Sequence, residues 1–167
     1  MSLVEGPIFQ VAWVVDDIAA GEQYFADTLG VEKWLTMPNV PFSPEFCTFR
    51  GEPAEYVIDV SIGYSGGQQL ELIRPVSGAN LYAEFLERNG PGMHHVGWVP
   101  DNYEAALAKA RELRIDIPQQ GGFGELGMEF AYLEGGALGS YVELMFLAPN
   151  MRAMFDSLVP KGFSNPW

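Results

Sequence analysis

Two stretches of the chain share one pattern of apolar and polar residues. Residues 10–17 (QVAWVVDD) match residues 95–102 (HVGWVPDN), with Val, Trp, Val and Asp identical at the same places. In each stretch an alternating run, typical of a half-buried strand, stops at an Asp or Asn and passes into an Ala-rich helical pattern. An Asp or Asn suits a helix N-cap, because its side-chain oxygen accepts a hydrogen bond from a free amide of the first turn. The sequence therefore predicts strand, cap and helix twice.

Each half of the chain also ends on a similar apolar strand. Residues 69–73 (QLELI) match residues 141–145 (YVELM), and each run follows a Gly-rich turn, which indicates a strand entered from a tight turn. Both halves therefore follow the plan of a strand, a helix and about three strands. The remaining strands are predicted at residues 47–49, 56–62 and 128–133. The Pro-bearing residues 37–53 are expected to form a loop that lengthens the first half.

A short helix and a tight turn separate the two halves. Apolar residues follow helical spacing in the stretch from Asn80 to Asn89, which leads into Gly-Pro-Gly. We place the module boundary there. The expected division is an N-terminal module with its linker helix at 1–89, a C-terminal module at 90–148, and a C-terminal helix and tail at 149–167. We interpret the last segment as a packing helix that covers a sheet edge.

Composition and charge narrow the class of protein. The 167 residues are 48% hydrophobic and 19% charged, which favours a packed globule over disorder. The net charge of −13 repels nucleic acid and anionic lipid, so neither is an expected partner. No apolar run approaches the roughly 18 residues of a spanning helix, and the first residues lack the basic flank of a signal peptide, so a cytoplasmic protein is expected. Cys47 is the only cysteine, which excludes an internal disulfide and a multi-thiolate metal site.

Four polar side chains occupy matching places in the repeat. Strand residues alternate between faces, so Gln10 and His95 point to equivalent faces of their opening strands. Glu71 and Glu143 each lie between apolar residues of a closing strand, where an uncompensated carboxylate is costly. If the modules pack about a pseudo-twofold axis, the four groups converge. One amide oxygen, one imidazole and two carboxylates suit a borderline divalent cation with positions open for water or substrate.

Taken alone, each of these four residues has an ordinary structural interpretation. A strand-end glutamine, a core histidine with hydrogen-bond partners and solvent-facing acids would account for them one by one, and only the joint pattern favours a metal site. Asp59 and His94 break the repeat and are interpreted as structural residues. His94 is expected to point away from His95, because neighbours on a regular strand face opposite sides.

These features resemble the vicinal oxygen chelate superfamily, which includes glyoxalase I, methylmalonyl-CoA epimerase, extradiol dioxygenases and bleomycin resistance proteins. The resemblance rests on the duplicated plan, the phrase GPGMHHV at residues 90–96 and the two Leu/Val-Glu-Leu strands, and it covers residues 8–147. It is closest to the epimerase at residues 82–89 and in the strand that follows. It implies an α+β fold of two βαβββ modules whose curved mixed sheets form an open cup around a divalent metal.

The resemblance places the metal ligands at Gln10, Glu71, His95 and Glu143. This set is similar to that of some glyoxalase I enzymes, whereas the epimerase usually has His at the first position and Gln at the second. Zn, Ni, Co, Mn and Fe are not distinguished. Val14 stands where glyoxalase I enzymes carry an arginine that holds glutathione.

The implied chemistry is removal of a proton next to a carbonyl through a metal-stabilised enolate, by an isomerase, epimerase or lyase acting on a small acyl thioester or hydroxyketone. Glu143 is the first candidate for the base and Glu71 the second. Only Arg50, Arg74 and Arg88 are candidate anion-binding residues near the cup.

Two alternatives remain open. A metal-free protein of the bleomycin-resistance type would sequester a small hydrophobic molecule in the same cup. An extradiol-type dioxygenase is less favoured, because that chemistry uses two imidazoles and one carboxylate on Fe(II). The family further implies a homodimer.

Overall fold

The computed structural model describes residues 3–167; Met1 and Ser2, at the start of the expected N-terminal module, lie outside the described residues. The first half contains the following elements: β1 (Gln10–Val14), α1 (Ile18–Leu29), β2 (Trp34–Phe42), β3 (Thr48–Phe49), β4 (Glu52–Pro53), β5 (Tyr56–Ser65) and β6 (Gln68–Ser77). As the sequence predicts, Asp17 caps α1 by accepting a hydrogen bond from the amide of Ala20, and Gly30 ends the helix in the left-handed conformation.

The second half repeats the plan after a connecting helix. Its elements are α2 (Leu81–Asn89), β7 (Gly92–Trp98), α3 (Tyr103–Glu112), β8 (Gln119–Gly122), η1 (Gly124–Leu126), β9 (Met128–Glu134), η2 (Gly136–Leu138), β10 (Tyr141–Leu147) and α4 (Pro149–Asp156). Asn80 and Asn102 cap α2 and α3 with their side-chain oxygens. Across residues 3–167, no helix is both long and apolar enough to span a membrane.

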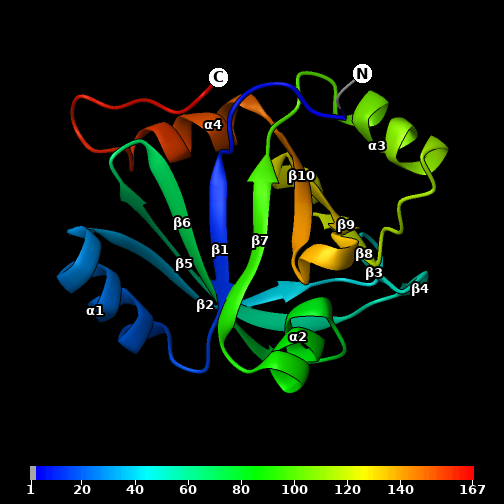
Figure 1. Ribbon diagram of the computed structural model, residues 1–167, viewed down its shortest axis with the longest axis horizontal. Coiled ribbons are helices and arrows are strands. Elements are labelled where there is room, and N and C mark those ends of the chain that lie inside the picture. Colours follow the sequence, from blue (N-terminus) through cyan, green and yellow to red (C-terminus); the bar gives the residue numbers. More distant parts are fainter. Residues whose placement is uncertain (1–2) are drawn as a thin grey trace.

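The strands form one curved mixed sheet in the order β2-β5-β6-β1-β7-β10-β9-β8-β3-β4. β1 and β7 are antiparallel neighbours at its centre, and each runs parallel to the closing strand of its own half, β6 or β10. Figure 1 shows α1 and α3 on opposite sides of the molecule, with α4 and α2 at its two ends. The α+β fold of two strand-helix-strand units in a curved mixed sheet is confirmed.

The expected loop at residues 37–53 is partly wrong. β2 continues to Phe42 and pairs with β5, and the β3–β4 hairpin extends the far edge of the sheet by pairing β3 with β8. Pro41 is tolerated in β2 because this is an edge strand, where one side of the backbone needs no hydrogen-bond donor. Residues 37–53 therefore connect the two halves of the sheet, because β3 of the first half pairs with β8 of the second.

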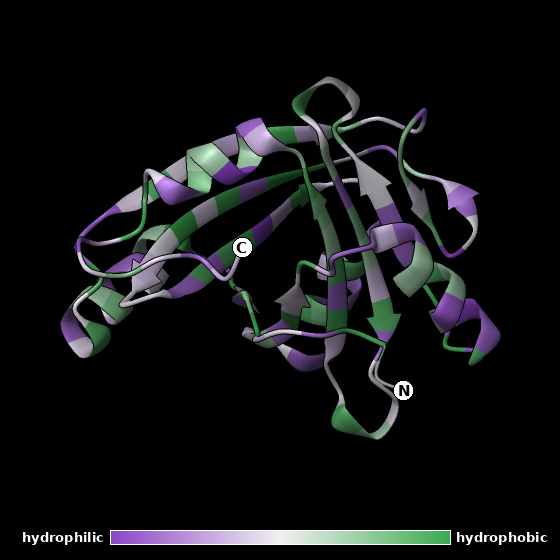
Figure 2. Cartoon of the chain, turned by 90° about the horizontal axis from the view of Figure 1, so that it is seen from above, coloured by the Kyte–Doolittle hydropathy of each residue, from purple (hydrophilic) through white to green (hydrophobic). Residues whose placement is uncertain are grey.

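Alternation along the strands separates an outer and an inner core. Leu70 and Leu72 of β6 pack with Phe25 of α1 on the outer face, while Ile73 belongs to the inner core. Figure 2 shows this alternation as bands of hydrophilic and hydrophobic colour along the strands. The same strand that carries Glu71 therefore presents its acid to the inside of the cup.

The C-terminal segment closes one end of the cup. Phe155 of α4 is buried in the inner core, and its ring lies 5.8 Å from that of Phe9. The ring of Trp167 lies 4.9 Å from the same Phe9 ring. The segment contains a packing helix, as the sequence predicts, but the expected place over a sheet edge is wrong: α4 contacts the internal strand β10 and buries its apolar side chains against the aromatic interior.

Candidate functional site

Small residues stand between the four candidate side chains on the concave face. In one row across the sheet, Ala12 of β1 lies between Glu71 of β6 and His95 of β7. The methyl group of Ala12 leaves room above the sheet, so the longer flanking side chains can meet over it. Register and residue size together therefore bring one acid to the imidazole.

A second row repeats this arrangement with a glycine. Gly97 of β7 lies between Gln10 of β1 and Glu143 of β10. A methyl group at Gly97 would lie 2.6 Å from Cε of Met145, 3.3 Å from Cβ of Gln10 and 3.4 Å from Oε2 of Glu143. The space at Gly97 is thus already taken by the side chains that meet there.

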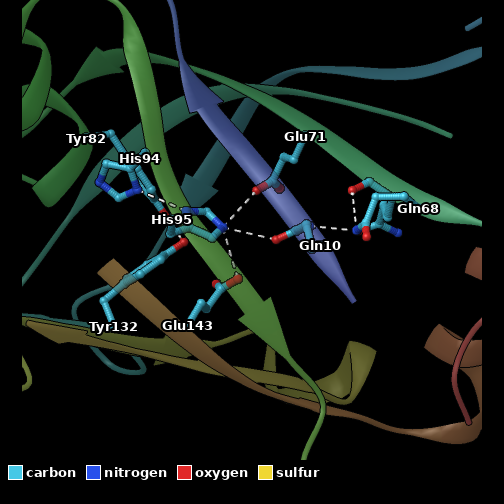
Figure 3. A network of polar contacts seen from close by, with 9 residues as sticks. Gln10, Gln68, Glu71, Tyr82, His94, His95, Tyr132 and Glu143 are labelled. Atoms are coloured by element: carbon cyan, nitrogen blue, oxygen red, sulfur yellow. Dashed lines mark hydrogen bonds and ion pairs between the residues drawn. The ribbon is translucent and has the colours of Figure 1, made fainter. Parts of the chain in front are cut away.

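The four side chains meet around one ring nitrogen, as Figure 3 shows. Nε2 of His95 lies 3.0 Å from Oε1 of Gln10, 3.2 Å from Oε2 of Glu143 and 3.5 Å from Oε2 of Glu71. Gln10, His95 and Glu143 are at most 3% exposed, and the side chain of Glu71 is 13% exposed. The structure thus brings together all four residues that the sequence singled out.

Glu71 and Glu143 lie close to the same imidazole, and the protein environment of both carboxyl groups is unusual for an acid. Burial raises the pKa of Glu71 well above its ordinary value, and the negative charge of Glu143 raises it further. Oε2 of Glu143 is close to His95 but makes no aligned hydrogen bond. A buried carboxylate oxygen without a hydrogen-bond partner is costly, which indicates a position where a further positive or hydrogen-donating group is accommodated.

The donor set fits a divalent cation. Within the described part of the chain, no three or more His, Cys, Asp and Glu side chains have the spacing of a preformed metal site, and here the oxygens contact the ring nitrogen directly. Donor atoms bound to one cation at about 2.1 Å are roughly 3.0 to 3.4 Å apart. The three distances from Nε2 of His95 lie in or close to this range. Gln10, Glu71, His95 and Glu143 are therefore the residues that would hold one ion, once their side chains rearrange around it.

The expected orientation of His94 is wrong. Strand pairing passes from Ala12–His95 directly to Trp13–Met93, so His94 is an extra residue in β7 and forms a β-bulge. The bulge breaks the alternation and turns the buried His94 ring to the side of His95, with the two Nδ1 atoms 2.9 Å apart. Burial lowers the pKa of His94 well below its ordinary value, and His95 lowers it further.

Two tyrosines beside the imidazoles were not found from the sequence. The hydroxyl groups of Tyr82 and Tyr132 lie 2.8 Å apart, and their rings pack 5.2 Å from His94 and 5.0 Å from His95 respectively. Burial raises the pKa of both phenols well above the ordinary value, so both are neutral. A tyrosine in a helix or strand has the pattern of any core residue, and nothing in the sequence marked these two.

A chain of hydrogen bonds holds the amide of Gln10 in one orientation. Nε2 of Gln10 donates to Oε1 of Gln69 at 2.7 Å, which directs Oε1 of Gln10 to His95. Nε2 of Gln69 donates in turn to the hydroxyl of Tyr64 at 2.8 Å. That hydroxyl donates to Oδ1 of Asn165 at 3.1 Å, which connects the cluster to the C-terminal segment.

The three candidate anion-binding arginines form ion pairs outside the cluster. Arg74 pairs with Asp59, a residue that the sequence marked as structural. Arg50 and Arg88 both pair with Glu84 of α2, at 2.5 and 3.0 Å. Their positive charges are therefore partly neutralised before any anion arrives.

Comparisons with known proteins agree with this architecture. The family model described as "Glyoxalase/Bleomycin resistance protein/Dioxygenase superfamily" matches residues 9–132. No curated protein matches the chain significantly. Among solved structures, the chain is similar to methylmalonyl-CoA epimerase from Mycobacterium tuberculosis, with a TM-score of 0.64 and 19% identity over 92% of this chain and 95% of that chain.

Two further structures have the same fold. One is a methylmalonyl-CoA epimerase in complex with methylmalonyl-CoA and NH4+, with a TM-score of 0.60 and 21% identity over 87% of this chain and 97% of that chain. The other is a Streptomyces coelicolor methylmalonyl-CoA epimerase variant in complex with 2-nitronate-propionyl-CoA, with a TM-score of 0.60 and 22% identity over 89% of this chain and 97% of that chain. The family model covers most of the sequence and the sheet has the matching architecture, so the chain belongs to the glyoxalase/bleomycin resistance/dioxygenase superfamily, the vicinal oxygen chelate proteins.

Proposed function

We propose that this protein is a divalent-metal-dependent isomerase, epimerase or lyase that removes a proton next to a carbonyl group. The observation that carries the proposal is the convergence of the oxygens of Gln10, Glu71 and Glu143 on Nε2 of His95. Two acids lie 3.2 and 3.5 Å from one imidazole nitrogen. Burying acids in this way costs folding free energy, so their presence favours a functional role over a purely structural one. Membership of the superfamily supports an enzyme of this class.

The four side chains would hold the cation, and the two carboxylates would balance its charge. A divalent cation bound there would accept a carbonyl oxygen and stabilise the negative charge that develops when the neighbouring C–H is deprotonated. Gln10 is already oriented for this task by its hydrogen bond to Gln69. The protein's own part in the chemistry is then to position the substrate and to move the proton.

Glu143 is our first candidate for the base and Glu71 the second. Oε2 of Glu143 has no hydrogen-bond partner, so it can take a proton without first breaking a hydrogen bond. Glu71 is the more accessible acid, and burial and the charge of Glu143 make it hold a proton more firmly than an ordinary glutamate. The acids come from opposite sides of the central strand pair, so one can remove a proton and the other return it, as an epimerase requires.

A small acyl thioester is the favoured substrate class, with a hydroxyketone-type compound as the other. Two similar structures were solved with CoA thioesters or their analogues. Ala12 and Gly97 lie between the four side chains, Met145 contacts the space at Gly97 and Tyr141 packs against His94, and these small or largely apolar groups suit a short acyl chain.

A metal-free binding protein is the second candidate function. The inner core is rich in aromatic side chains, which would suit a small hydrophobic ligand. An extradiol-type dioxygenase gains little support from the inward position of His94. Its contact is with Nδ1 of His95, whereas the acids meet at Nε2, so His94 is not placed as a second imidazole ligand.

Metal analysis and proton exchange test the proposal together. We expect protein purified without chelator to bind about one equivalent of a transition metal, and Glu143→Ala to bind it at least about tenfold more weakly. We also expect metal-dependent exchange of the substrate C–H in D2O, followed by NMR over a panel of acyl thioesters and hydroxyketones. Glu129→Ala, which removes an exposed acid from β9, is the matched control. Ligand binding without metal, retained in Glu143→Ala, would support the binding protein instead.

We also propose a homodimer located in the cytoplasm. The dimer is a property that the family implies, and the single buried Cys47 suits a reducing compartment. Light scattering should give twice the mass of one chain, and a monomer at micromolar concentration would contradict the dimer.

A further inference from the structure

We infer that His94 is a positioning residue: it accepts the Nδ1 proton of His95 and so leaves Nε2 of His95 free to bind the cation. This inference rests on the proposed metal-dependent function. It assigns a role to a residue outside the set of four, on the basis of the bulge that turns its ring toward His95.

The contact that carries the inference joins two like atoms. Nδ1 of His94 lies 2.9 Å from Nδ1 of His95, and both rings are fully buried. At this distance one nitrogen carries the proton and the other accepts it. The position of that proton therefore determines which tautomer of His95, protonated on Nδ1 or on Nε2, faces the acids.

If His94 donates, the proton of a neutral His95 lies on Nε2. The 3.0 Å contact with Oε1 of Gln10 is then a hydrogen bond, and the Nε2 lone pair is not available to a metal. If His95 donates, Nε2 is unprotonated and its lone pair faces the oxygens of Gln10, Glu143 and Glu71. Lone pairs on all these atoms repel one another unless a cation lies among them, so this second arrangement is the one that binds metal.

The far side of His94 permits the second arrangement. Nε2 of His94 is buried and has no hydrogen-bond partner. Its ring packs against the aromatic rings of Tyr82 and Phe85, at 5.2 and 5.1 Å. No side chain therefore fixes which nitrogen of His94 carries its proton, although the backbone of Leu81 also interacts with the ring. The proton count of the pair is unchanged between the two arrangements: His95 is protonated on Nδ1 instead of Nε2, and His94 on Nε2 instead of Nδ1.

Metal ligands of this type are generally oriented by the partner of their second ring nitrogen, and loss of that partner typically weakens metal binding 10- to 100-fold. Here a histidine takes the place that a carboxylate or a backbone carbonyl fills in many sites. Without the bulge, His94 would face the outer side of the sheet and Nδ1 of His95 would lose this acceptor.

Zinc affinity of three variants tests the role. His94→Phe keeps an aromatic ring but removes both nitrogens, and we expect it to bind zinc about 10- to 100-fold more weakly in competition with a chelator. His94→Asn keeps an acceptor oxygen near the place of Nδ1 and should stay within about threefold of the parent. Tyr82→Phe is the matched control, because it removes a hydroxyl beside His94 and leaves the Nδ1–Nδ1 contact intact.

NMR of the parent protein provides a test that does not depend on any variant folding. In the zinc-loaded protein with 15N-labelled histidines, we expect the His95 proton on Nδ1, with a scalar coupling across the hydrogen bond to Nδ1 of His94. Absence of this proton, or parent-like zinc affinity of folded His94→Phe, overturns the inference and leaves the proposed metal function standing. Failure of the parent to bind any divalent metal overturns both.

Discussion

At the residue scale, the cluster depends on two small residues as much as on its four polar side chains. Ala12 and Gly97 occupy the sheet positions between the four polar side chains, where a larger residue would separate them. Gly97 is needed for close approach rather than for a special backbone conformation. Its replacement therefore tests whether the cluster requires that space.

We expect Gly97→Ala to lower zinc affinity at least about tenfold, because the new methyl group would force Met145 to move and would crowd Gln10 and Glu143 at 3.3 and 3.4 Å. Overpacking should also reduce the free energy of unfolding by about 1–3 kcal/mol. Gly121→Ala is the matched control, since its methyl group would lie 2.5 Å from Sγ of Cys47, away from the cluster. Equal effects of the two variants on zinc affinity would contradict the prediction.

The raised pKa of Glu71 predicts a pH dependence of stability for the metal-free protein. Above the ordinary value of 4.5, the folded protein retains a proton on Glu71 that the unfolded chain releases. Stability must therefore fall as pH rises from 4.5 through the raised pKa, by up to about 1.4 kcal/mol per pH unit. Denaturant unfolding of the parent and of Glu71→Gln over this range should show the parent losing stability relative to the variant. A constant difference would contradict the assignment.

At the element scale, α2 holds the bulged part of β7 in place. Its Tyr82 and Phe85 rings pack on His94, and its first amide, that of Leu81, donates to Oε1 of Gln119 at 2.8 Å. Asn80 caps the helix and donates through Nδ2 to the carbonyl of Gly78. The linker helix thus acts as one wall of the cup and not only as a connection.

We expect Asn80→Ala to reduce the free energy of unfolding by about 1–2 kcal/mol, because a cap and a second, partly buried hydrogen bond are lost together. Asn102→Ala removes the matching cap of α3 at an exposed position and should cost about 1 kcal/mol or less. Chemical denaturation of both variants gives the comparison. If Asn80→Ala lowers the free energy of unfolding no more than Asn102→Ala does, then capping of α2 contributes less to stability than its burial indicates.

At the scale of the whole molecule, the cluster is enclosed by a segment distant in sequence. Tyr64 connects it to Asn165, and Trp167 packs on Phe9. Because Gln10, His95 and Glu143 are at most 3% exposed, a molecule from solvent reaches these three side chains when part of this enclosure moves, whereas Glu71 is already 13% exposed. The C-terminal segment is held in this enclosure by Phe155, by Trp167 and by the hydrogen bond between Tyr64 and Asn165.

We expect Asn165→Ala to accelerate removal of zinc by a chelator and to reduce the free energy of unfolding by about 1–3 kcal/mol, because Tyr64 and Asp156 lose a buried partner. Ser164→Ala, at an exposed neighbouring position, should change neither quantity. An unchanged rate of zinc removal in Asn165→Ala would indicate that the chelator reaches the cluster by a route that does not involve the C-terminal segment.

Much of the architecture followed from local pattern. Alternation predicted the central strands, Asp17 and Gly30 marked the ends of α1, and the internal repeat singled out the four side chains that meet at His95. These features depend on residues within a few positions of one another, or on equivalence between two copies, and both are visible in a linear sequence. The division into modules at 1–89, 90–148 and 149–167 stays an interpretation.

Contacts between distant residues decided the rest. The bulge at His94 arises from the pairing of β7 with β1, the β3–β4 hairpin finds β8 some seventy residues onward, and α4 packs on the inner core. Arg50 and Arg74 likewise form ion pairs with residues that are distant in sequence, Glu84 and Asp59. The amino-acid order alone determined which residues alternate, cap and repeat, because these are properties of neighbours along the chain. Only the tertiary structure decided register, enclosure and the direction of His94, because each depends on which distant surfaces are buried together.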